Sequence, residues 1–347
     1  MTQRVLYEAV DFPIFQNRMY DTVEAAHACP RGQIRIVEDQ KTGLVYNAAF
    51  DPDLMVYDAA YQNEQGNSVP FRAHLNWAAD LVRATMGDRL IEVGCGKGTF
   101  LEMLAERGAD ITGFDPTYEG DDPRIEKLYF GPDVGMNGDG LVLRHVLEHI
   151  QNPVDFLMQL AEANGGQGLI YIEVPCLDWI CDNRAWFDLF YEHVNYFRLD
   201  DFYKIFSRVV EAGNCFGGQY LYVVADLATL KKPVYDDENT VSFPDDFTDS
   251  LTAANSSDQD VVWGGASKGL IFSMLRARAG RPVAGVIDIN PAKQGKFLAG
   301  TGLRVSAPNE LLPNLSPEAR ILVMNPNYTK EIKEMSGNAF TYVEVGK

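Results

Sequence analysis

The sequence predicts an α/β protein built around a doubly wound, Rossmann-like sheet, and three observations lead to this fold class. Short apolar segments alternate with segments of helical periodicity over most of the chain. The apolar segment at 89–94 ends in a glycine-rich turn, and the segment at 110–114 is followed directly by an acidic residue. Strands that alternate with helices favour a parallel sheet covered by helices on both faces.

The central elements follow one another in a regular order. A helix begins near Ser68, where apolar residues recur at helical spacing, and leads to the strand at 89–94. A helix at 99–107 ends at Gly108, before the strand at 110–114. The remaining expected elements are strands at 140–145 and 168–175, with a helix at 153–163 between them.

The pattern predicts three domains. A polar, acidic stretch at 229–260 is the best candidate for a linker, and the alternation of strands and helices resumes after it. The elements expected there are a strand at 261–265, a helix at 268–279, and strands at 282–290 and 319–326. The resulting domains are a small N-terminal module of short strands and loops at 1–67, a central domain at 68–230, and the linker with a second Rossmann-like domain at 231–347.

Composition excludes several classes of partner. The 347 residues include 30 basic and 49 acidic side chains, which gives a formal net charge of −19. Such a surface disfavours nucleic acid and anionic membranes, which bind through Lys and Arg. No apolar run has the length of a signal peptide or a membrane span, and the five cysteines form no CxxC pair. We therefore expect a cytoplasmic protein with reduced thiols and a small-molecule substrate.

The strongest motif is the loop Glu-Val-Gly-Cys-Gly-Lys-Gly at 92–98, which joins a predicted strand to a predicted helix. Glycines let the backbone approach a ligand closely, and Asp115 ends the next strand, where an acid can accept hydrogen bonds from ribose hydroxyls. The GxGxG spacing fits S-adenosylmethionine (SAM) better than a dinucleotide, because SAM has no pyrophosphate. A dinucleotide site or a purely structural turn are the alternatives.

On these residues the chain resembles the class I SAM-dependent methyltransferases, and within them the C-methyltransferases of nucleotide-linked 4-keto-deoxy sugars. Further shared segments are RHVLEHI (144–150), FYEHVNYF (190–197), WGGASKG (263–269) and NPNY (325–328). The resemblance implies a small N-terminal domain, a methyltransferase domain and a C-terminal Rossmann-like domain. The cofactor-binding residues that it implies are Glu92, Gly94, Gly96, Gly98, Asp115, Pro116, Arg144 and His145.

Two features bear on metals. The family commonly has a cysteine-based zinc site in its N-terminal domain, whereas here that region offers only His27 and Cys29, so we expect no zinc. The segment from His145 to His149 also matches HxxEH, a zinc-protease signature that would place both histidines on one helix face. Because the segment follows a predicted strand at the wall of the SAM pocket, we favour a role beside the cofactor.

The histidines suggest the chemistry. Methylation of carbon beside a ketone needs a base that removes a proton to form an enolate, and SAM supplies only the electrophile. His193 is the natural base, with Glu192 as a carboxylate that orients it or tunes its pKa. The resemblance matches Glu192 and His193 to the family's catalytic pair and His149 to its second histidine. His149 or Tyr191 could stabilise the enolate oxygen; the alternative for His193 is a structural role in an aromatic patch.

Substrate-binding candidates are weaker. By resemblance, Tyr61 and Arg72 match substrate-side positions, and an anionic sugar nucleotide needs a local cation such as Arg72 in so acidic a protein. Asn327 and Tyr328 follow a predicted strand, at the edge where open α/β sheets bind ligands. The glycines of WGGASKG, with Asp288, resemble a degenerate dinucleotide motif, but their spacing does not suit a pyrophosphate, so we interpret them as structural.

The sequence thus predicts a SAM-dependent C-methyltransferase that acts on a nucleotide-linked 4-keto-deoxy sugar through an enolate formed by His193. An O- or N-methyltransferase of another sugar or small metabolite is the first alternative. A non-catalytic SAM-binding protein of a glycan pathway is the alternative from a different class.

Overall fold

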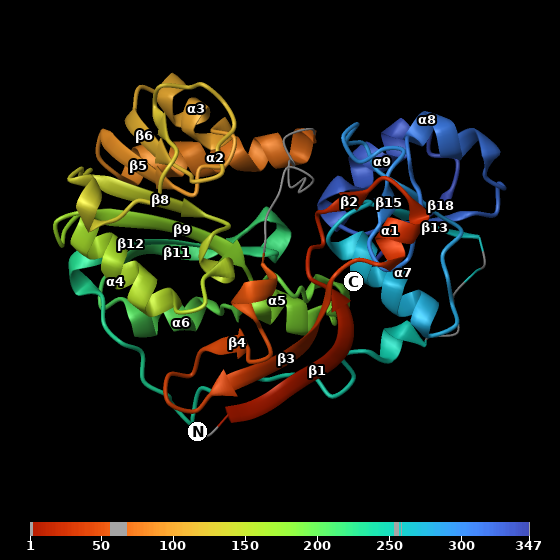
Figure 1. Ribbon diagram of the computed structural model, residues 1–347, viewed down its shortest axis with the longest axis horizontal. Coiled ribbons are helices and arrows are strands. Elements are labelled where there is room, and N and C mark those ends of the chain that lie inside the picture. Colours follow the sequence, from red (N-terminus) through yellow and green to blue (C-terminus); the bar gives the residue numbers. More distant parts are fainter. Residues whose placement is uncertain (1–2, 56–67, 253–256, 258, 347) are drawn as a thin grey trace.

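The computed structural model describes residues 3–55, 68–252, 257 and 259–346, arranged around three main sheets (Figure 1). The N-terminal sheet lies at the bottom of that view, the central sheet at the left and the C-terminal sheet at the right. The predicted α/β class is confirmed. Tyr61 lies outside the described residues. None of the described helices is both long and apolar enough to cross a membrane.

The central sheet has the strand order β11-β12-β9-β8-β5-β6-β7. Five neighbouring strands run parallel to one another, namely β9, β8, β5, β6 and β7. Strand β12 pairs antiparallel with both β9 and β11. The sheet is therefore mixed, and the expectation of a wholly parallel sheet missed the β11–β12 hairpin. The strands are β5 (Arg89–Val93), β6 (Asp110–Phe114), β7 (Ile125–Glu126), β8 (Gly140–Arg144), β9 (Leu169–Pro175), β11 (Val209–Cys215) and β12 (Tyr220–Asp226).

Helices cover both faces of the central sheet. On one face α2 (Val69–Thr85) and α3 (Thr99–Glu106) pack on alternate strand residues such as Leu90 and Val142. On the other face α4 (Pro153–Ala163) and α6 (Leu199–Ile205) pack on the intervening residues, including Ile91. Apolar residues on both faces of each strand explain the nearly continuous hydrophobic runs in the sequence.

The N-terminal sheet is antiparallel, in the order β1-β3-β4-β10. Its strands are β1 (Gln3–Pro13), β3 (Arg31–Asp39), β4 (Val45–Asn47) and β10 (Asn195–Tyr196). The long β1 has two register irregularities against β3, which explains why its sequence lacks a clean alternation. Because β10 directly follows His193, this sheet is joined to the segment that carries the predicted base.

The C-terminal sheet is wholly parallel, in the order β16-β14-β13-β17-β18. Its strands are β13 (Asp260–Trp263), β14 (Gly285–Ile287), β16 (Val305–Ser306), β17 (Arg320–Val323) and β18 (Thr341–Glu344), with helices α7 (Lys268–Arg278), α8 (Pro308–Leu311) and α9 (Thr329–Met335). Strand β14 is shorter than the predicted 282–290, because Asp288 accepts a hydrogen bond from the backbone N–H of Asn290 and turns the chain.

Short elements complete the fold. Strand β2 (Met19–Tyr20) pairs with β15 (Phe297–Leu298), which ties the N-terminal segment to the C-terminal unit. The remaining helices are α1 (Val23–His27) and α5 (Leu177–Asp182). The 3-10 turns are η1 (Pro52–Leu54), η2 (Pro132–Val134), η3 (Leu147–His149), η4 (Trp186–Asp188), η5 (Phe216–Gly218), η6 (Leu227–Thr229), η7 (Asp249–Leu251), η8 (Leu312–Asn314) and η9 (Pro326–Tyr328).

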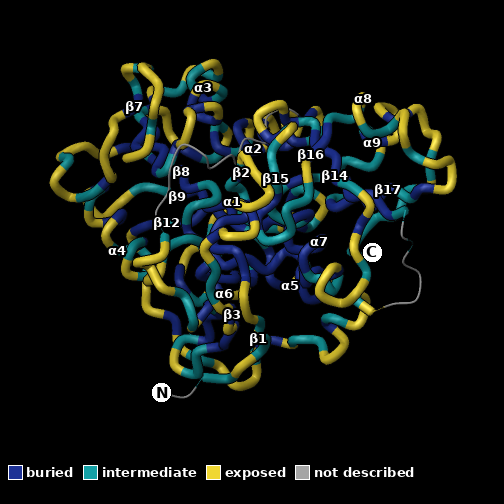
Figure 2. Tube along the Cα trace, turned by 45° about the vertical axis from the view of Figure 1, so that its right-hand side comes forward, coloured by how far each residue is buried: buried dark blue, intermediate teal, exposed yellow. Residues whose placement is uncertain are grey.

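One apolar core is shared by the N-terminal sheet, the C-terminal sheet and the segment that follows β9. It contains Ile36 of β3, Ile180 of α5 and Val262 of β13, and the rings of Trp186 and Phe272 stack within it at 5.2 Å. In Figure 2 the tube is dark blue where α5 and α7 meet. The aromatic segment before His193 therefore lies in the centre of the molecule rather than on a loose surface loop.

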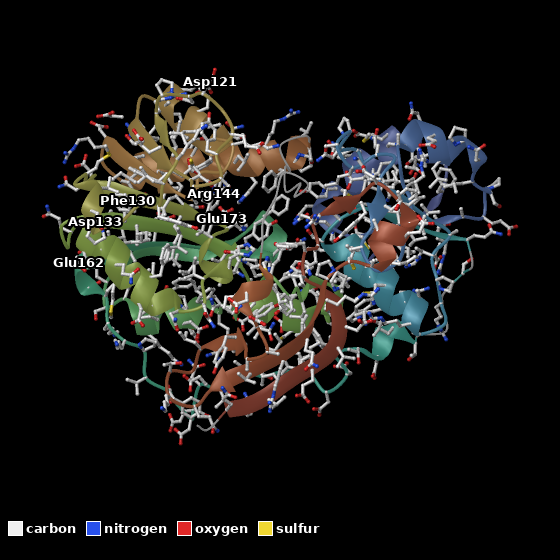
Figure 3. All side chains as sticks on the ribbon, viewed as in Figure 1. Asp121, Phe130, Asp133, Arg144, Glu162 and Glu173 are labelled. Atoms are coloured by element: carbon white, nitrogen blue, oxygen red, sulfur yellow. The ribbon has the colours of Figure 1, made fainter. Side chains whose placement is uncertain are left out.

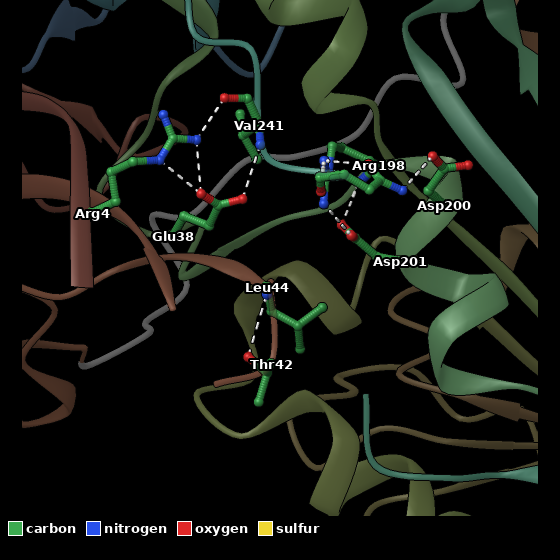
Figure 4. A network of polar contacts seen from close by, with 9 residues as sticks. Arg4, Glu38, Thr42, Leu44, Arg198, Asp200, Asp201 and Val241 are labelled. Carbon is green, nitrogen blue, oxygen red and sulfur yellow. Dashed lines mark hydrogen bonds and ion pairs between the residues drawn. The ribbon is translucent and has the colours of Figure 1, made fainter. Parts of the chain in front are cut away.

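The predicted linker is anchored along much of its length. The backbone N–H of Tyr235 donates to the carbonyl of Lys41, and that of Val241 donates to a Glu38 carboxylate at 2.9 Å. Arg4 joins this carboxylate to the carbonyl of Val241 (Figure 4). Glu38 is fully buried. The stretch thus binds the N-terminal sheet as a strap, and its acidic composition reflects exposed side chains rather than a free linker.

Candidate functional site

The glycine loop between β5 and α3 adopts the conformation that its composition predicts. Gly94, Gly96 and Gly98 all have positive φ angles, of 72°, 55° and 79°. A Cβ atom on Gly94 would lie 2.5 Å from Val146, and one on Gly98 would lie 2.6 Å from Ile125, whereas one on Gly96 would meet no atom within 4 Å. The outer glycines are needed for packing, and Gly96 leaves its backbone open to a ligand.

Asp115 holds this loop. One oxygen of its carboxylate accepts a hydrogen bond from the backbone N–H of Gly96 at 2.8 Å, and the other accepts from the backbone and side chain of Thr117. The structure thus brings the loop and Asp115 together as predicted, with Pro116 exposed beside them. The direct role of Asp115 is to fix the loop, and its contact with a ribose remains a prediction.

Glu92 and Arg144 are largely buried behind the loop, and the positive charge of Arg144 acts on the Glu92 carboxyl. Glu92 has one carboxylate oxygen without a partner among the described residues, and burial raises its pKa to about 8 against the opposing charge of Arg144. The Arg144 guanidinium lies 4.4 Å from the ring of Phe100, and its Nε also lacks a partner there. Unsatisfied buried groups are costly, so the pair is suited to a ligand with complementary charges.

A residue that the sequence analysis missed organises the site. Glu173, at the end of β9, is fully buried, and its carboxylate accepts hydrogen bonds from Arg144 at 2.8 Å, His74 at 3.0 Å and Tyr171 at 2.7 Å (Figure 3). Burial alone would raise its pKa, but Arg144 and two histidines, His74 and His145, hold the pKa of Glu173 well below its usual range. The available signal was a single acid within the apolar run GLIYIEVP.

His145 does not lie on a helix, which corrects the helical interpretation of HxxEH. It follows β8 with a φ angle of 52°, and only Leu147–His149 form a short 3-10 turn. Its backbone N–H donates to the carbonyl of Glu173, and this contact holds the residue at the end of the strand. The two histidines therefore leave the backbone in different directions, and the i, i+4 geometry of a helical zinc site is absent from this segment.

The structure brings the candidate residues His149 and His193 together. Their ring centroids are 5.0 Å apart, and Nδ1 of His149 lies 2.8 Å from the carbonyl of Glu192. A carbonyl oxygen only accepts, so Nδ1 carries the proton in this contact. Burial and then the positive charges of His149, His145 and Lys268 hold the pKa of His193 well below its usual value. His193 is therefore neutral at neutral pH, as a base must be.

Glu192 and Tyr191 face the N-terminal unit. One carboxylate oxygen of Glu192 accepts a hydrogen bond from the backbone N–H of Gln16, and its carbonyl contacts His149. The hydroxyl of Tyr191 accepts a hydrogen bond from the backbone N–H of Asp51 at 2.9 Å, and its ring occupies the space beside Gly32. Both residues therefore join the histidine segment to the N-terminal sheet, and their catalytic roles remain predictions.

The predicted substrate residues lie at separate places. Arg72 is exposed on α2. The Asn327 side chain donates to the carbonyl of Phe216 at 2.8 Å, and the Tyr328 ring lies 5.8 Å from that of Phe216. Asn327 and Tyr328 therefore dock the C-terminal unit on the turn of the β11–β12 hairpin.

Lys268 is a second missed residue of the site. It begins α7, yet its amine reaches the central unit, where it contacts the carboxylate of Asp188 at 2.7 Å and the side-chain oxygen of Gln219 at 2.8 Å. The Trp179 ring lies 4.9 Å from the amine. The motif WGGASKG contained this lysine, but only the folded chain brings its charge close enough to affect His193.

Two groups of described residues resemble metal sites, each with ligand atoms within 4.8 Å of one another. They are His74, Glu173 and Cys215, and Glu148, His149 and His193. Glu173 is already paired with Arg144, and His145 lies 3.3 Å from Glu148. Burial lowers the pKa of His145, but its attraction to Glu148 and Glu173 is stronger and raises that pKa to about 9. Because Glu148 belongs to one group and Glu173 to the other, a metal cation in either group would be repelled by the positive charge of His145. We therefore interpret both groups as proton-bearing networks.

Comparison with known families agrees with this geometry. Residues 72–209 match the model of a family described as a methyltransferase domain. These residues are therefore similar to methyltransferase domains. The matched segment contains the glycine loop, Asp115, Arg144, Glu173 and both histidines of the pair.

Curated relatives are also methyltransferases. The C-methyltransferase NovU of Streptomyces niveus is 24% identical over 201 residues, which are 52% of this chain and 48% of NovU. A ubiquinone biosynthesis O-methyltransferase of Bordetella avium is 44% identical over 41 residues, or 12% of this chain and 17% of that protein. The chain thus spans about half or less of the length of these relatives.

Similar solved structures share part of the chain. The plantazolicin methyltransferase BpumL in complex with SAH is 15% identical, with a TM-score of 0.36 over 45% of this chain and 83% of that one. A putative O-methyltransferase from Nostoc punctiforme PCC 73102 is 18% identical, with a TM-score of 0.34 over 44% of this chain and 55% of that one.

Proposed function

We propose that the protein is a SAM-dependent C-methyltransferase acting on a nucleotide-linked 4-keto-deoxy sugar. The observation that carries this proposal is the partly buried pair of His149 and His193, whose rings are 5.0 Å apart, with His193 kept neutral. A base of this kind is needed to remove a proton from carbon but not to methylate an already nucleophilic atom. The match to a C-methyltransferase, although distant, supports the same reaction class.

The cofactor would bind against the glycine loop. Gly96 offers open backbone, and the unpartnered atoms of Glu92 and Arg144 suit the charged amino-acid end of SAM. When bound, SAM supplies an electrophilic methyl group and leaves as S-adenosylhomocysteine once the new carbon–carbon bond has formed.

The protein's own residues would generate the nucleophile. His193 takes the proton from the carbon beside the ketone, and the electrons of that C–H bond form the enolate, whose oxygen becomes negative. His149 has already committed its Nδ1 proton to the carbonyl of Glu192. It can therefore donate to the enolate oxygen only through a protonated Nε2, so the reaction requires a neutral His193 beside a cationic His149.

An O-methyltransferase is the second candidate, and the matches to ubiquinone biosynthesis O-methyltransferases favour it. In that case His193 would accept a hydroxyl proton instead of a carbon-bound one. The two candidates differ in whether hydrogen beside a ketone exchanges with solvent.

Mass spectrometry in heavy water tests the proposal. A panel of 4-keto-deoxyhexose nucleotides is incubated with SAM and the protein, His193→Ala, or the matched control His27→Gln, whose histidine is exposed. We expect a methyl mass gain and deuterium beside the ketone with the native protein and the control, and neither with His193→Ala. SAM binding without methylation or exchange on any member of the panel would overturn the C-methyl proposal and favour another acceptor or a non-catalytic protein.

A further inference from the structure

The backbone places His145 between two buried carboxylates. With a φ angle of 52°, the residue occupies the left-handed region that side-chain-bearing residues rarely adopt, although histidine is one of the types enriched there. Its Nδ1 lies 3.3 Å from Glu148, and its Nε2 lies 3.0 Å from Glu173. The second contact is close but poorly aligned for a hydrogen bond, so it is mainly electrostatic. Both nitrogens thus face negative charge, which favours the doubly protonated ring.

Glu148 connects this arrangement to the histidine pair. Its side chain is almost fully buried, and one carboxylate oxygen contacts His145 while the other has no hydrogen-bond partner among the described residues. Ligand atoms of Glu148, His149 and His193 lie within 4.8 Å of one another. The carbonyl of Glu148 also accepts a hydrogen bond from the backbone N–H of Val194, which holds the turn against the segment that carries His193.

We propose that His145 and the buried Glu148 form a charge pair that sets the proton affinity of His193, with the imidazolium lowering it and the carboxylate raising it. The two residues act as positioning residues for charge and need not touch the substrate. This inference rests on the proposed role of His193 as the base, because it explains how a partly buried histidine is kept unprotonated beside a carboxylate.

The other groups around His193 complete the electrostatic account. His149 contacts it ring to ring, and Lys268 adds positive charge from α7. Glu192 adjoins it in the chain, and the uncharged rings of Phe190 and Tyr196 lie at 4.8 and 6.3 Å. Without His145, the Glu148 carboxylate would lose its closest cation and act on His193 uncompensated. Loss of His145 should therefore raise the pKa of His193, and additional loss of Glu148 should lower it again.

Nuclear magnetic resonance of histidine side chains tests this directly. The chain has five histidines, so each ring can be followed in full-length protein labelled at histidine, and the His193 signal is assigned by its loss in His193→Gln. We expect His145→Gln to raise the pKa of His193 by about one unit or more. The double variant His145→Gln/Glu148→Gln should have a lower His193 pKa than His145→Gln alone.

Controls separate charge from structural damage. His74→Gln removes another histidine from Glu173 without altering Glu148 and should leave the His193 pKa unchanged. His145→Lys keeps a cation and should retain a low value. Two results would overturn the inference. The first is a His193 pKa in His145→Gln that is equal to or lower than that of the native protein. The second is a His193 pKa that is higher in the double variant than in His145→Gln. If His145→Gln does not fold, Glu148→Gln provides the test instead. A His193 pKa that is higher in Glu148→Gln than in the native protein would then overturn the inference.

This experiment needs neither SAM nor a sugar. If the pKa order is found but the sugar panel shows no exchange, the proposed substrate fails while the charge pair stands. If exchange is found but the order is not, the proposed function stands and the inference about His145 fails.

Discussion

The central and C-terminal sheets carry two glycine loops built on the same plan but with different surroundings. In both, an acid after the second strand accepts a hydrogen bond from a loop glycine at 2.8 Å, Asp115 from Gly96 and Asp288 from Gly265. The central loop leaves open space at Gly96, whereas a Cβ on Gly269 of the C-terminal loop would lie 1.8 Å from the carbonyl oxygen of Gly264.

The charges of the two loops differ as well. The two loops differ at the position two residues before the first glycine. The central loop has Glu92 there, which has a buried carboxylate oxygen without a partner among the described residues, whereas the C-terminal loop has the apolar Val262. The C-terminal loop is also covered by the N-terminal segment, since the carbonyl of Gln16 and the side chain of Asn17 accept hydrogen bonds from Ser267. The same backbone plan thus keeps open space and an unpartnered polar atom at the central loop, which supports the proposed SAM site there, whereas Gly269 of the C-terminal loop is tightly enclosed.

The largest expected difference is in the pH dependence of stability. The pKa of Glu92 is about 8 in the folded protein and 4.5 in the unfolded chain. The stability that the protonated Glu92 contributes to the folded state is therefore fully present below pH 4.5 and is lost as pH rises through 8. Relative to Glu92→Gln, the native protein should lose on the order of 4 kcal/mol of unfolding free energy across this range. Urea unfolding of both proteins from pH 4.5 to 8.5 measures the difference, and parallel curves would contradict it.

Alanine substitution should affect the two loops differently. Gly269→Ala forces a methyl group against backbone and should cost about 3 kcal/mol of unfolding free energy. Gly96→Ala meets no neighbour and should cost only about 1 kcal/mol through its positive φ angle, but it should weaken SAM binding. Urea unfolding with calorimetric titration of SAM measures both effects. Equal losses of stability would show that the C-terminal loop is no tighter than the central one.

The amine of Lys268 links the C-terminal loop to the central unit. Lys268→Met leaves the Asp188 carboxylate buried without its cation, and this should cost about 2 to 3 kcal/mol of unfolding free energy. Adding Asp188→Asn should restore part of that loss. Thermal and urea unfolding of the single and double variants measures the coupling, and additive losses would mean that the ion pair does not hold the units together.

The smallest expected effect compares the two acids. Asp115→Asn should weaken SAM binding about tenfold, because the neutral amide orients the Gly96 loop less firmly. Asp288→Asn should leave SAM affinity unchanged, although it weakens the equivalent contact with Gly265. Calorimetric titration of the two variants decides this. A similar loss of affinity in both would indicate that the C-terminal loop takes part in cofactor binding.

The sequence by itself determined the elements whose signal is local. Helix α4 spans Pro153–Ala163 as predicted, and the glycine loop, with Asp115 after the next strand, could be placed because periodicity and glycine spacing depend on neighbouring residues. His149 and His193 were chosen as candidates through a resemblance of motifs, and only the structure shows that their rings lie together. The acidic stretch was predicted as a linker, and composition does not reveal that this segment is anchored through Val241, which binds Glu38 across 203 positions.

Only the tertiary structure decided how charge is arranged in the site. Glu173 meets His74 from 99 positions away, and Lys268 reaches Gln219 from another sheet. The left-handed backbone at His145 follows from the end of β8 and its contact with Glu173, which no local pattern encodes. Burial and long-range contacts set the pKa values of these groups, and both depend on the folded chain as a whole. The sequence therefore specified which residues are available for the chemistry, and folding determined their protonation.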